Sequence, residues 1–112
     1  MKIYLGGPMR GYPDFNFPAF HAATATLRAQ GHTVFNPAER DETAYGSYAL
    51  KSPTGDLKDV PQFDLRDALL ADLFWICRSA EAIYLLPGWK QSKGATAERA
   101  VGIALGLEIM EL

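Results

Sequence analysis

AIYLLPGWKQSKGATAERAVGIALG, residues 82–106, is the stretch that decides the fold. Its first five residues are all apolar, which is typical of a buried strand, and Pro, Gly and small polar residues then favour a turn. A helix is predicted from Gly94 to Gly106, because apolar residues recur there at the spacing of one helix face. A strand, a turn and a helix in this order indicate an α/β protein with a parallel sheet.

Two carboxylates stand at positions that the helical spacing directs toward the core. Glu98 shares its helix face with apolar residues three and four positions away, and Asp72 falls within a leucine stripe of a second predicted helix, residues 63–78. A buried carboxylate must be paired or used in chemistry, so both are candidate functional residues. Structural roles stay open at this point: Glu98 with its own helix N-terminus, and Asp72 paired with Arg78 or Arg99.

The rest of the chain continues the alternation of strands and helices. Further elements are predicted as a strand at 2–5, a helix from 16 to 31, and strands at 32–35 and 107–112. Residues 38–61 are polar and interrupted by Gly and Pro, which predicts an unstructured, mobile lid. The order favours one domain, residues 1–112, with a three-layer α/β/α architecture around a parallel sheet of four to five strands.

Composition narrows the classes of protein that fit. The chain of 112 residues is 48% hydrophobic and carries a formal net charge of -2, which argues against binding to a nucleic acid polymer. One cysteine, Cys77, and two histidines are too few for a disulfide or a zinc site, and no metal or cofactor is expected. No apolar run approaches the ~20 residues of a membrane span, so a soluble cytoplasmic protein is expected.

A second apolar strip on the helix of residues 63–78 is more than a monomer needs. Leu70, Phe74 and Cys77 lie on a different side of that helix from Asp72. We expect another copy of the chain to cover this strip, giving a homodimer or homotetramer. Cys77 is expected to be a small buried hydrophobic residue.

Candidate ligand-binding residues follow the predicted strand ends, where ligands of parallel α/β sheets bind. They are Gly6, Gly7, Arg10, Asn36, Ser92 and Gly94. A helix that starts at Ser92–Ala95 offers free N–H groups, a hydroxyl and the positive end of the helix dipole, which are features of a phosphate site. Two carboxylates beside an anion site suit glycosyl transfer, with one as nucleophile and one handling the proton of the leaving base.

Three segments resemble the nucleoside 2-deoxyribosyltransferase-like superfamily in order and spacing. They are IYLGGPMRG at 3–11, DLFWICRSAEAIYLL at 72–86 and SKGATAERAVGIALG at 92–106. The superfamily includes deoxyribosyltransferases and nucleoside 5′-monophosphate N-glycosidases. The likeness is greatest to a small family of bacterial and phage domains with a Pro-Gly-Trp corner and an S-x-G-A-x-x-E turn. The resemblance implies a flavodoxin-like sheet, a homodimer or dimer of dimers with sites near the interface, and no metal.

The resemblance also implies roles for three catalytic residues. Glu98 matches the family nucleophile, Asp72 matches the acidic residue that contacts the sugar and helps proton transfer, and Tyr4 matches a tyrosine that orients the nucleophile. Glu81 stands where the family usually has aspartate, and residues 38–61 have no clear counterpart.

The implied substrate is a nucleotide. Gly6, Gly7 and Arg10 match a loop of the monophosphate glycosidases in which the arginine lies by the phosphate. Ser92 matches a position where those enzymes carry serine and where transferases acting on free nucleosides tend to carry aspartate; Lys93 adds a positive charge. We therefore expect an N-glycosidase of (deoxy)nucleoside 5′-monophosphates. The alternatives are a nucleoside 2-deoxyribosyltransferase, a non-catalytic nucleotide-binding or sensing domain, and a purely structural assembly module.

Overall fold

Four short strands form one sheet in which every neighbouring pair runs parallel. The computed structural model describes all 112 residues. Its strands are β1 (Lys2–Gly6), β2 (Thr33–Phe35), β3 (Ala82–Leu85) and β4 (Glu108–Glu111). Their order across the sheet is β2-β1-β3-β4, which is the order of the first four strands in flavodoxin-like proteins. The predicted parallel α/β sheet is confirmed.

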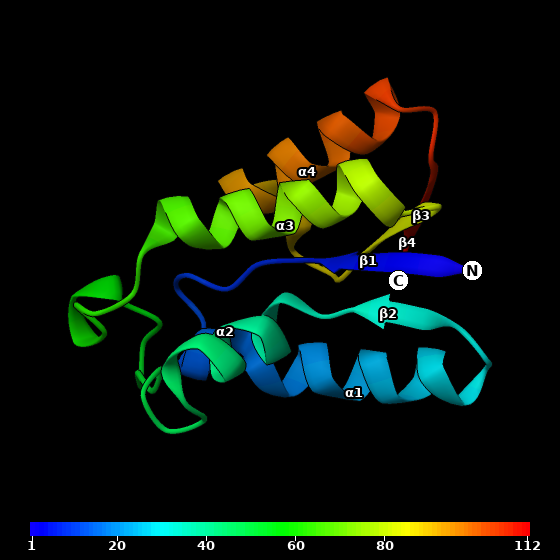
Figure 1. Cartoon of the computed structure of the whole chain (residues 1–112). Helices are drawn as coiled ribbons and strands as arrows, with labels where there is room; N and C mark the ends of the chain where they lie inside the picture. The colour runs from blue at the N-terminus through cyan, green and yellow to red at the C-terminus, as the bar shows by residue number, and fades with distance from the viewer.

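Four helices cover the two faces of the sheet (Figure 1). They are α1 (Phe17–Ala29), α2 (Pro37–Tyr45), α3 (Leu65–Ser79) and α4 (Lys93–Ala104). Figure 1 shows α1 and α2 on one side of the strands and α3 with α4 on the other, which makes three layers. Short 3-10 turns occur at Pro13–Asn16, Leu57–Asp59 and Trp89–Gln91. The fold is therefore the three-layer α/β/α arrangement that the alternation of elements predicts.

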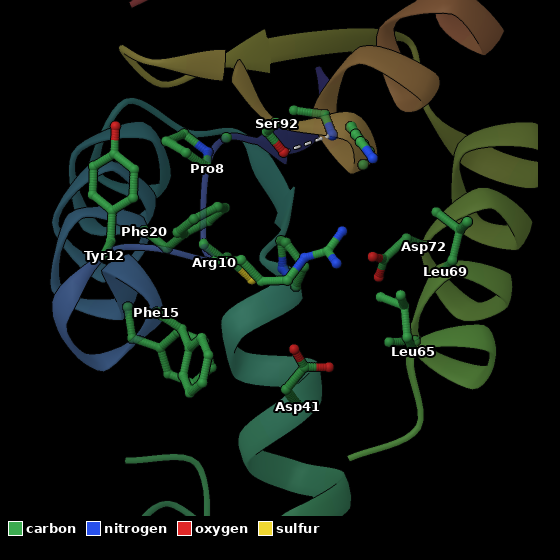
Figure 2. A pocket seen from close by; sticks show the side chains of 18 of the residues that line it. Pro8, Arg10, Tyr12, Phe15, Phe20, Asp41, Leu65, Leu69, Asp72 and Ser92 are labelled. Carbon is green, nitrogen blue, oxygen red and sulfur yellow. Dashed lines mark hydrogen bonds between the residues drawn. The ribbon is translucent and has the colours of Figure 1, made fainter. Parts of the chain in front are cut away.

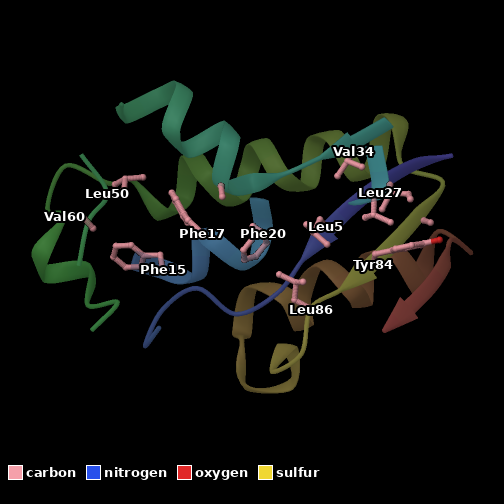
Figure 3. Packing of buried hydrophobic residues seen from close by; sticks show 13 residues of the cluster. Leu5, Phe15, Phe17, Phe20, Leu27, Val34, Leu50, Val60, Tyr84 and Leu86 are labelled. Carbon is pink, nitrogen blue, oxygen red and sulfur yellow. The ribbon is translucent and has the colours of Figure 1, made fainter. Parts of the chain in front are cut away.

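Alternation along β1 divides the core between the two faces. Ile3 and Leu5 are fully buried in a cluster on the α1 side, which Figure 3 shows. Tyr4, between them, is fully buried in a second cluster with Ile76 of α3 and Ile83 of β3. Each buried apolar side chain of this size contributes about 1.5–3 kcal/mol to folding. The pleat of one strand thus directs Tyr4 toward α3 and α4.

Residues 38–61 are not the unstructured connection that their composition predicts. Residues 37–45 form α2, because Asn36 caps the helix by accepting the N–H of Ala38, and Pro37 begins it. The following residues pack onto the body of the domain, with Leu50 and Val60 joining the core cluster of Figure 3. The prediction of an unstructured lid over residues 38–61 is therefore wrong for the part that forms α2.

Backbone hydrogen bonds tie the irregular part of this segment to the loop after β1. The N–H of Gly11 donates to the carbonyl of Gly55 at 3.0 Å, and the N–H of Asp14 donates to the carbonyl of Ser52 at 2.7 Å. The Ser52 hydroxyl is fully buried and donates to Asp59 at 2.6 Å. The two loops therefore form one wall beyond the end of β1.

The second apolar strip of α3 is exposed. Leu70 and Phe74 have exposed fractions of 67% and 62%, so the prediction that a second copy covers them stays a prediction. Cys77, the third member of this strip, is also exposed in the single chain, so its burial likewise stays a prediction that depends on a second copy. No helix combines the length and apolar character needed to cross a bilayer.

Candidate active site

A cavity of about 370 Å³ opens beyond the carboxyl ends of β1 and β3. In a sheet of this order, the chain leaves these two neighbouring strands toward opposite faces, which creates a crevice for ligands. The charged side chains that line the cavity are Arg10, Asp41, Asp72, Lys93 and Glu98. They come from the loop after β1 and from three different helices, α2, α3 and α4.

Tyr4 and Glu98 form a buried hydrogen-bonded pair at the base of this cavity. The Tyr4 hydroxyl donates to Glu98 Oε2 at 2.7 Å. Tyr4 is fully buried, and Glu98, in the second turn of α4, is only 6% exposed. Burial, and after it the negative charge of Asp72, raise the pKa of the Glu98 carboxyl well above its ordinary value. The predicted pairing of these two residues is present, and Tyr4 is the partner of Glu98.

Asp72 lies on the inner face of α3, between Ala68 and Ile76, and is 8% exposed. Its Oδ1 atom is buried and has no hydrogen-bond partner. Burial, and after it the charge of Asp41, raise the pKa of Asp72 to about 7. The cavity therefore contains an acid that can hold a proton near neutral pH and whose Oδ1 atom accepts no hydrogen bond from the protein.

The proposed structural partners of Asp72 are engaged elsewhere. Neither Arg78 nor Arg99 forms an ion pair. The guanidinium of Arg78 lies 5.9 Å from the centre of the Phe74 ring, and that of Arg99 lies 4.9 Å from the centre of the Trp89 ring. The structural alternative for Asp72, a pair with either arginine, is therefore not formed.

The charge of Asp72 raises the pKa of Glu98, and the charges of both carboxyls raise the pKa of Tyr4. Two such carboxyls in one buried site retain a proton between them around neutral pH. The hydroxyl of Tyr4 favours the ionised form of Glu98, because it donates a hydrogen bond to that carboxylate. The Oδ1 atom of Asp72 accepts no hydrogen bond. The two carboxyls therefore hold a proton between them near neutral pH, and the Tyr4 hydroxyl stabilises Glu98 when that carboxyl is ionised.

The start of α4 forms the opposite side of the cavity from Asp41, as Figure 2 shows through Ser92. Ser92 caps the helix: its Oγ accepts the N–H of Ala95 at 3.1 Å, the dashed line in Figure 2. Because this bond uses Oγ as acceptor, the hydroxyl hydrogen is free to donate to a ligand. The N–H groups of Lys93 and Gly94 have no partner, as expected in a first helical turn.

Gly94 leaves space above these N–H groups. A methyl group built at this residue would have no neighbour closer than 4.0 Å, where it would meet Ser92 Oγ. Gly94 also lines the cavity, so its backbone is open to an approaching ligand. Free N–H groups, a free hydroxyl and the helix dipole together suit a phosphate or carboxylate.

Arg10 is exposed and extends into the cavity from the loop after β1. Figure 2 shows its guanidinium pointing toward Asp72, but no ion pair joins the two groups. Its five N–H donors therefore remain available for an anionic or hydroxyl-bearing ligand.

The loop that carries Arg10 is held by a strained turn. Asp14, Phe15 and Asn16 have φ values of 49°, 55° and 63°, in the left-handed region. Each such residue costs about 1–2 kcal/mol. Asn16, at which the sequence predicts the first helix to begin, makes no cap bond to α1. Its side chain donates to the carbonyl of Pro8 at 3.0 Å instead. The turn directs the buried ring of Phe15 into the cavity wall.

Gly6 and Gly7 allow close packing at the end of β1. A Cβ atom on Gly6 would lie 3.4 Å from Glu98 Oε1, and one on Gly7 would lie 2.8 Å from the Cβ of Leu86. Gly7 lines the cavity, whereas Gly6 lies beneath the carboxylate of Glu98 and is not part of the lining. Both glycines thus bring the strand end close to its neighbours, and Gly6 supports Glu98 rather than a ligand.

Asn36 does not line the cavity, although its place after β2 predicts a binding role. Its Oδ1 accepts the N–H of Ala38 at 2.9 Å, and its Nδ2 lies 3.3 Å from Nδ1 of His21. The prediction fails because the amide is buried and used in capping α2 and bridging to α1. No group of three or more His, Cys, Asp or Glu side chains is arranged to hold a metal ion.

A family model matches residues 1–111, which is nearly the whole chain. The chain belongs to the family described as Domain of unknown function (DUF4406). No curated protein and no solved structure matches it. Because the description of DUF4406 states no activity, any function must be argued from the site of this chain.

Asp41 is the residue of this DUF4406 site that the sequence did not identify. It lies on α2, lines the cavity and is only 4% exposed. Burial raises the pKa of Asp41 to about 6, against the opposing effect of Arg40, whose Nη1 lies 3.3 Å from Oδ1. A signal was present: Asn36, Pro37 and Glu39 form the start of a helix with an N-cap, a first-turn proline and an acidic third residue.

Proposed function

We propose that this protein is an N-glycosidase that hydrolyses the N-glycosidic bond of a (deoxy)nucleoside 5′-monophosphate. The observation that carries the proposal is the Tyr4–Glu98 pair beside the unpartnered Asp72 in one cavity. A glycosidase needs one ionised carboxylate and one carboxylic acid within reach of the same bond. The proposal gives the ionised state to Glu98, which the Tyr4 hydroxyl stabilises, and the acid state to Asp72. Burial raises the pKa of both carboxyls, so the pair retains a proton near neutral pH.

The start of α4 supports a phosphate at one end of the substrate. Ser92 retains a hydroxyl hydrogen to donate, and the N–H groups of Lys93 and Gly94 are free. Arg10 extends into the same cavity without an ion-pair partner. A dianionic phosphate is the common ligand for which a free helix N-terminus and a guanidinium are complementary.

In the first chemical step, the Glu98 carboxylate attacks C1′ while the bond from C1′ to the base nitrogen breaks. The bonding electron pair leaves with the base, and Asp72 donates its proton to that base. Tyr4 orients Glu98 through the bond to Oε2, which leaves Oε1 to attack. The product of this step is a glycosyl ester on Glu98 and a free base.

In the second step, water attacks C1′ and Asp72, now ionised, takes a proton from it. The bond between C1′ and the Glu98 oxygen breaks, which restores the Glu98 carboxylate and the Asp72 acid. The second product is the sugar 5-phosphate. If a second base takes the place of water, the same two carboxyls exchange bases and the enzyme is a transferase.

The proposal is tested by incubating the protein with nucleosides and nucleoside monophosphates and following free base by chromatography. Glu98→Ala should abolish release of the base, because Glu98 is the only cavity carboxylate that accepts a hydrogen bond from a tyrosine hydroxyl. Glu108→Gln, an exposed change on β4, is the matched control and should leave release unchanged. Base release that survives in Glu98→Ala would sink the assignment of the nucleophile.

Tyr4→Phe supplies a second readout that a loss of folding would not imitate. Removal of the donor to Oε2 makes Glu98 harder to ionise, so the acidic limb of the pH–rate profile should move to higher pH. We expect kcat to fall by about tenfold or more, since the orienting bond is lost. An unchanged limb would contradict the role given to Tyr4.

Adding a second free base to the reaction distinguishes hydrolysis from base exchange.

A further inference from the structure

The wall of the cavity that α2 and the following loop provide is apolar except for one side chain. From α2 onward to the start of α3, that wall consists of Pro37, Asp41, Leu50, Leu57, Val60 and Phe63. Asp41 is therefore the only hydrogen-bonding side chain on this side. A planar aromatic ligand group would find apolar contacts here and a single polar group to recognise its edge.

One oxygen of Asp41 is satisfied by the protein and the other is not. Arg40 Nη1 donates to Oδ1 at 3.3 Å, and the same guanidinium also bonds Asp67. No hydrogen bond reaches Oδ2. Asp41 is only 4% exposed, and it lines the cavity. An ionised carboxylate held in this way needs a donor from a ligand or from water.

The position of Asp41 matches one end of an extended ligand. Figure 2 shows Asp41 and Ser92 on opposite sides of the cavity, with Arg10 and Asp72 between them. A phosphate at Ser92 and a sugar beside Asp72 direct the third part of a nucleotide, its base, toward Asp41. The order of these groups along the cavity is the order of phosphate, sugar and base in the substrate.

We propose that Asp41 is a specificity-determining residue whose Oδ2 accepts an N–H from the exocyclic amino group of the substrate base. This assignment rests on the proposed function. The site then selects amino-bearing bases, such as adenine or cytosine, over their oxo counterparts, hypoxanthine and uracil. A carboxylate accepts hydrogen bonds but donates none, so a carbonyl oxygen at the same place meets an acceptor and a negative charge.

The pKa of Asp41 agrees with this role at neutral pH. Burial raises it to about 6, so the side chain is mostly ionised at pH 7.5 and acts as an acceptor only. Arg40 restricts its rotation by holding Oδ1. The remaining oxygen is therefore fixed in direction, as base recognition requires.

The experiment measures binding without turnover, in the Glu98→Ala protein, by titration calorimetry at pH 7.5. The ligands are two matched pairs of deoxynucleotides, dAMP with dIMP and dCMP with dUMP. We expect the amino member of the better-binding pair to bind about 10- to 100-fold more tightly than its oxo partner. Adding Asp41→Asn should erase or reverse this ratio, because the amide can donate to a carbonyl.

Asp67→Asn is the matched control, since it removes the same charge from the other partner of Arg40 but lies outside the cavity. It should keep the ratio. Equal binding of amino and oxo members, or a ratio that Asp41→Asn leaves unchanged, overturns the role of Asp41 and leaves the proposed function standing. Failure of every monophosphate to bind overturns both. If Asp41→Asn does not fold, the ratio in the Glu98→Ala protein decides alone.

Discussion

Ser92→Asp separates two functions of the start of α4, which are capping of the helix and binding of a phosphate. In the structure, Ser92 caps the helix through Oγ and leaves its hydroxyl hydrogen free toward the cavity. Aspartate caps helices as well as serine does, and its charge is favourable at a helix N-terminus. The substitution should therefore change the free energy of unfolding by less than about 0.5 kcal/mol. Only the ligand should be sensitive to it.

The effect on a phosphate follows from charge. Two unit charges about 4 Å apart repel by about 4 kcal/mol at an effective dielectric constant near 20. Ser92 is partly exposed, so solvent reduces this value, and we expect about 2–4 kcal/mol against a monophosphate. This corresponds to a loss of about 30- to 700-fold in kcat/KM. A nucleoside without phosphate avoids the repulsion and should change by less than about threefold.

The assay compares kcat/KM for a monophosphate and its nucleoside in wild type, Ser92→Asp, Ser92→Ala and Ser47→Asp. Ser92→Ala removes the hydroxyl without adding charge and should cost about 1 kcal/mol of stability through loss of the cap. Ser47→Asp, in an exposed turn, controls for a distant charge. An unchanged ratio of monophosphate to nucleoside in Ser92→Asp would refute the placement of phosphate at α4. High salt should weaken a genuine effect.

Two further predictions concern stability. Asp72 has a folded pKa of about 7, raised from an unfolded value near 4, so its contribution to stability is present at low pH and is lost as pH rises through this window. The free energy of unfolding of Asp72→Asn, measured with urea, should therefore rise relative to that of wild type by up to about 4 kcal/mol between pH 4 and pH 8. Asp67→Asn, at an exposed position, is the control. Parallel curves of unfolding free energy against pH for Asp72→Asn and wild type would contradict this prediction. Gly55→Ala should cost about 2–4 kcal/mol, because φ is +72° and a Cβ would lie 2.4 Å from the carbonyl oxygen of Tyr12. Gly46→Ala, at φ +94° in open space, should cost only about 1 kcal/mol in the same denaturation assay, and equal losses would show that the contact with Tyr12 does not matter.

Much of the fold follows from periodicity in the sequence. The apolar run before Pro87 predicts β3, and the small-residue turn predicts the start of α4, which the structure confirms. Helical spacing also directs Glu98 and Asp72 inward, and both are buried. These predictions succeed because buried positions recur every two residues in a strand and every three to four residues in an amphipathic helix.

The segment after β2 escaped prediction because its burial has no such repeat. In α2 only Pro37, Ala38 and Asp41 are buried, so no apolar stripe marks the helix. The pattern therefore does not indicate Asp41, and it predicts a ligand-binding role for Asn36, which caps the helix instead. Local propensity also does not predict the left-handed turn that contains Phe15, because a residue such as phenylalanine adopts a positive φ only where tertiary contacts hold it there.

Stability alone does not explain why Asp41 and Asp72 are buried in the cavity. Asp72 is buried with a lone oxygen, and Asp41 has one oxygen without a partner. Each lies in surroundings that raise its pKa, so ionising it in the folded chain costs free energy. A ligand that supplies donors at one end and takes a proton at the other removes part of this cost. Burial of these two acids therefore lowers the stability of the folded chain. It also favours binding of a substrate that donates hydrogen bonds to one acid and accepts a proton from the other.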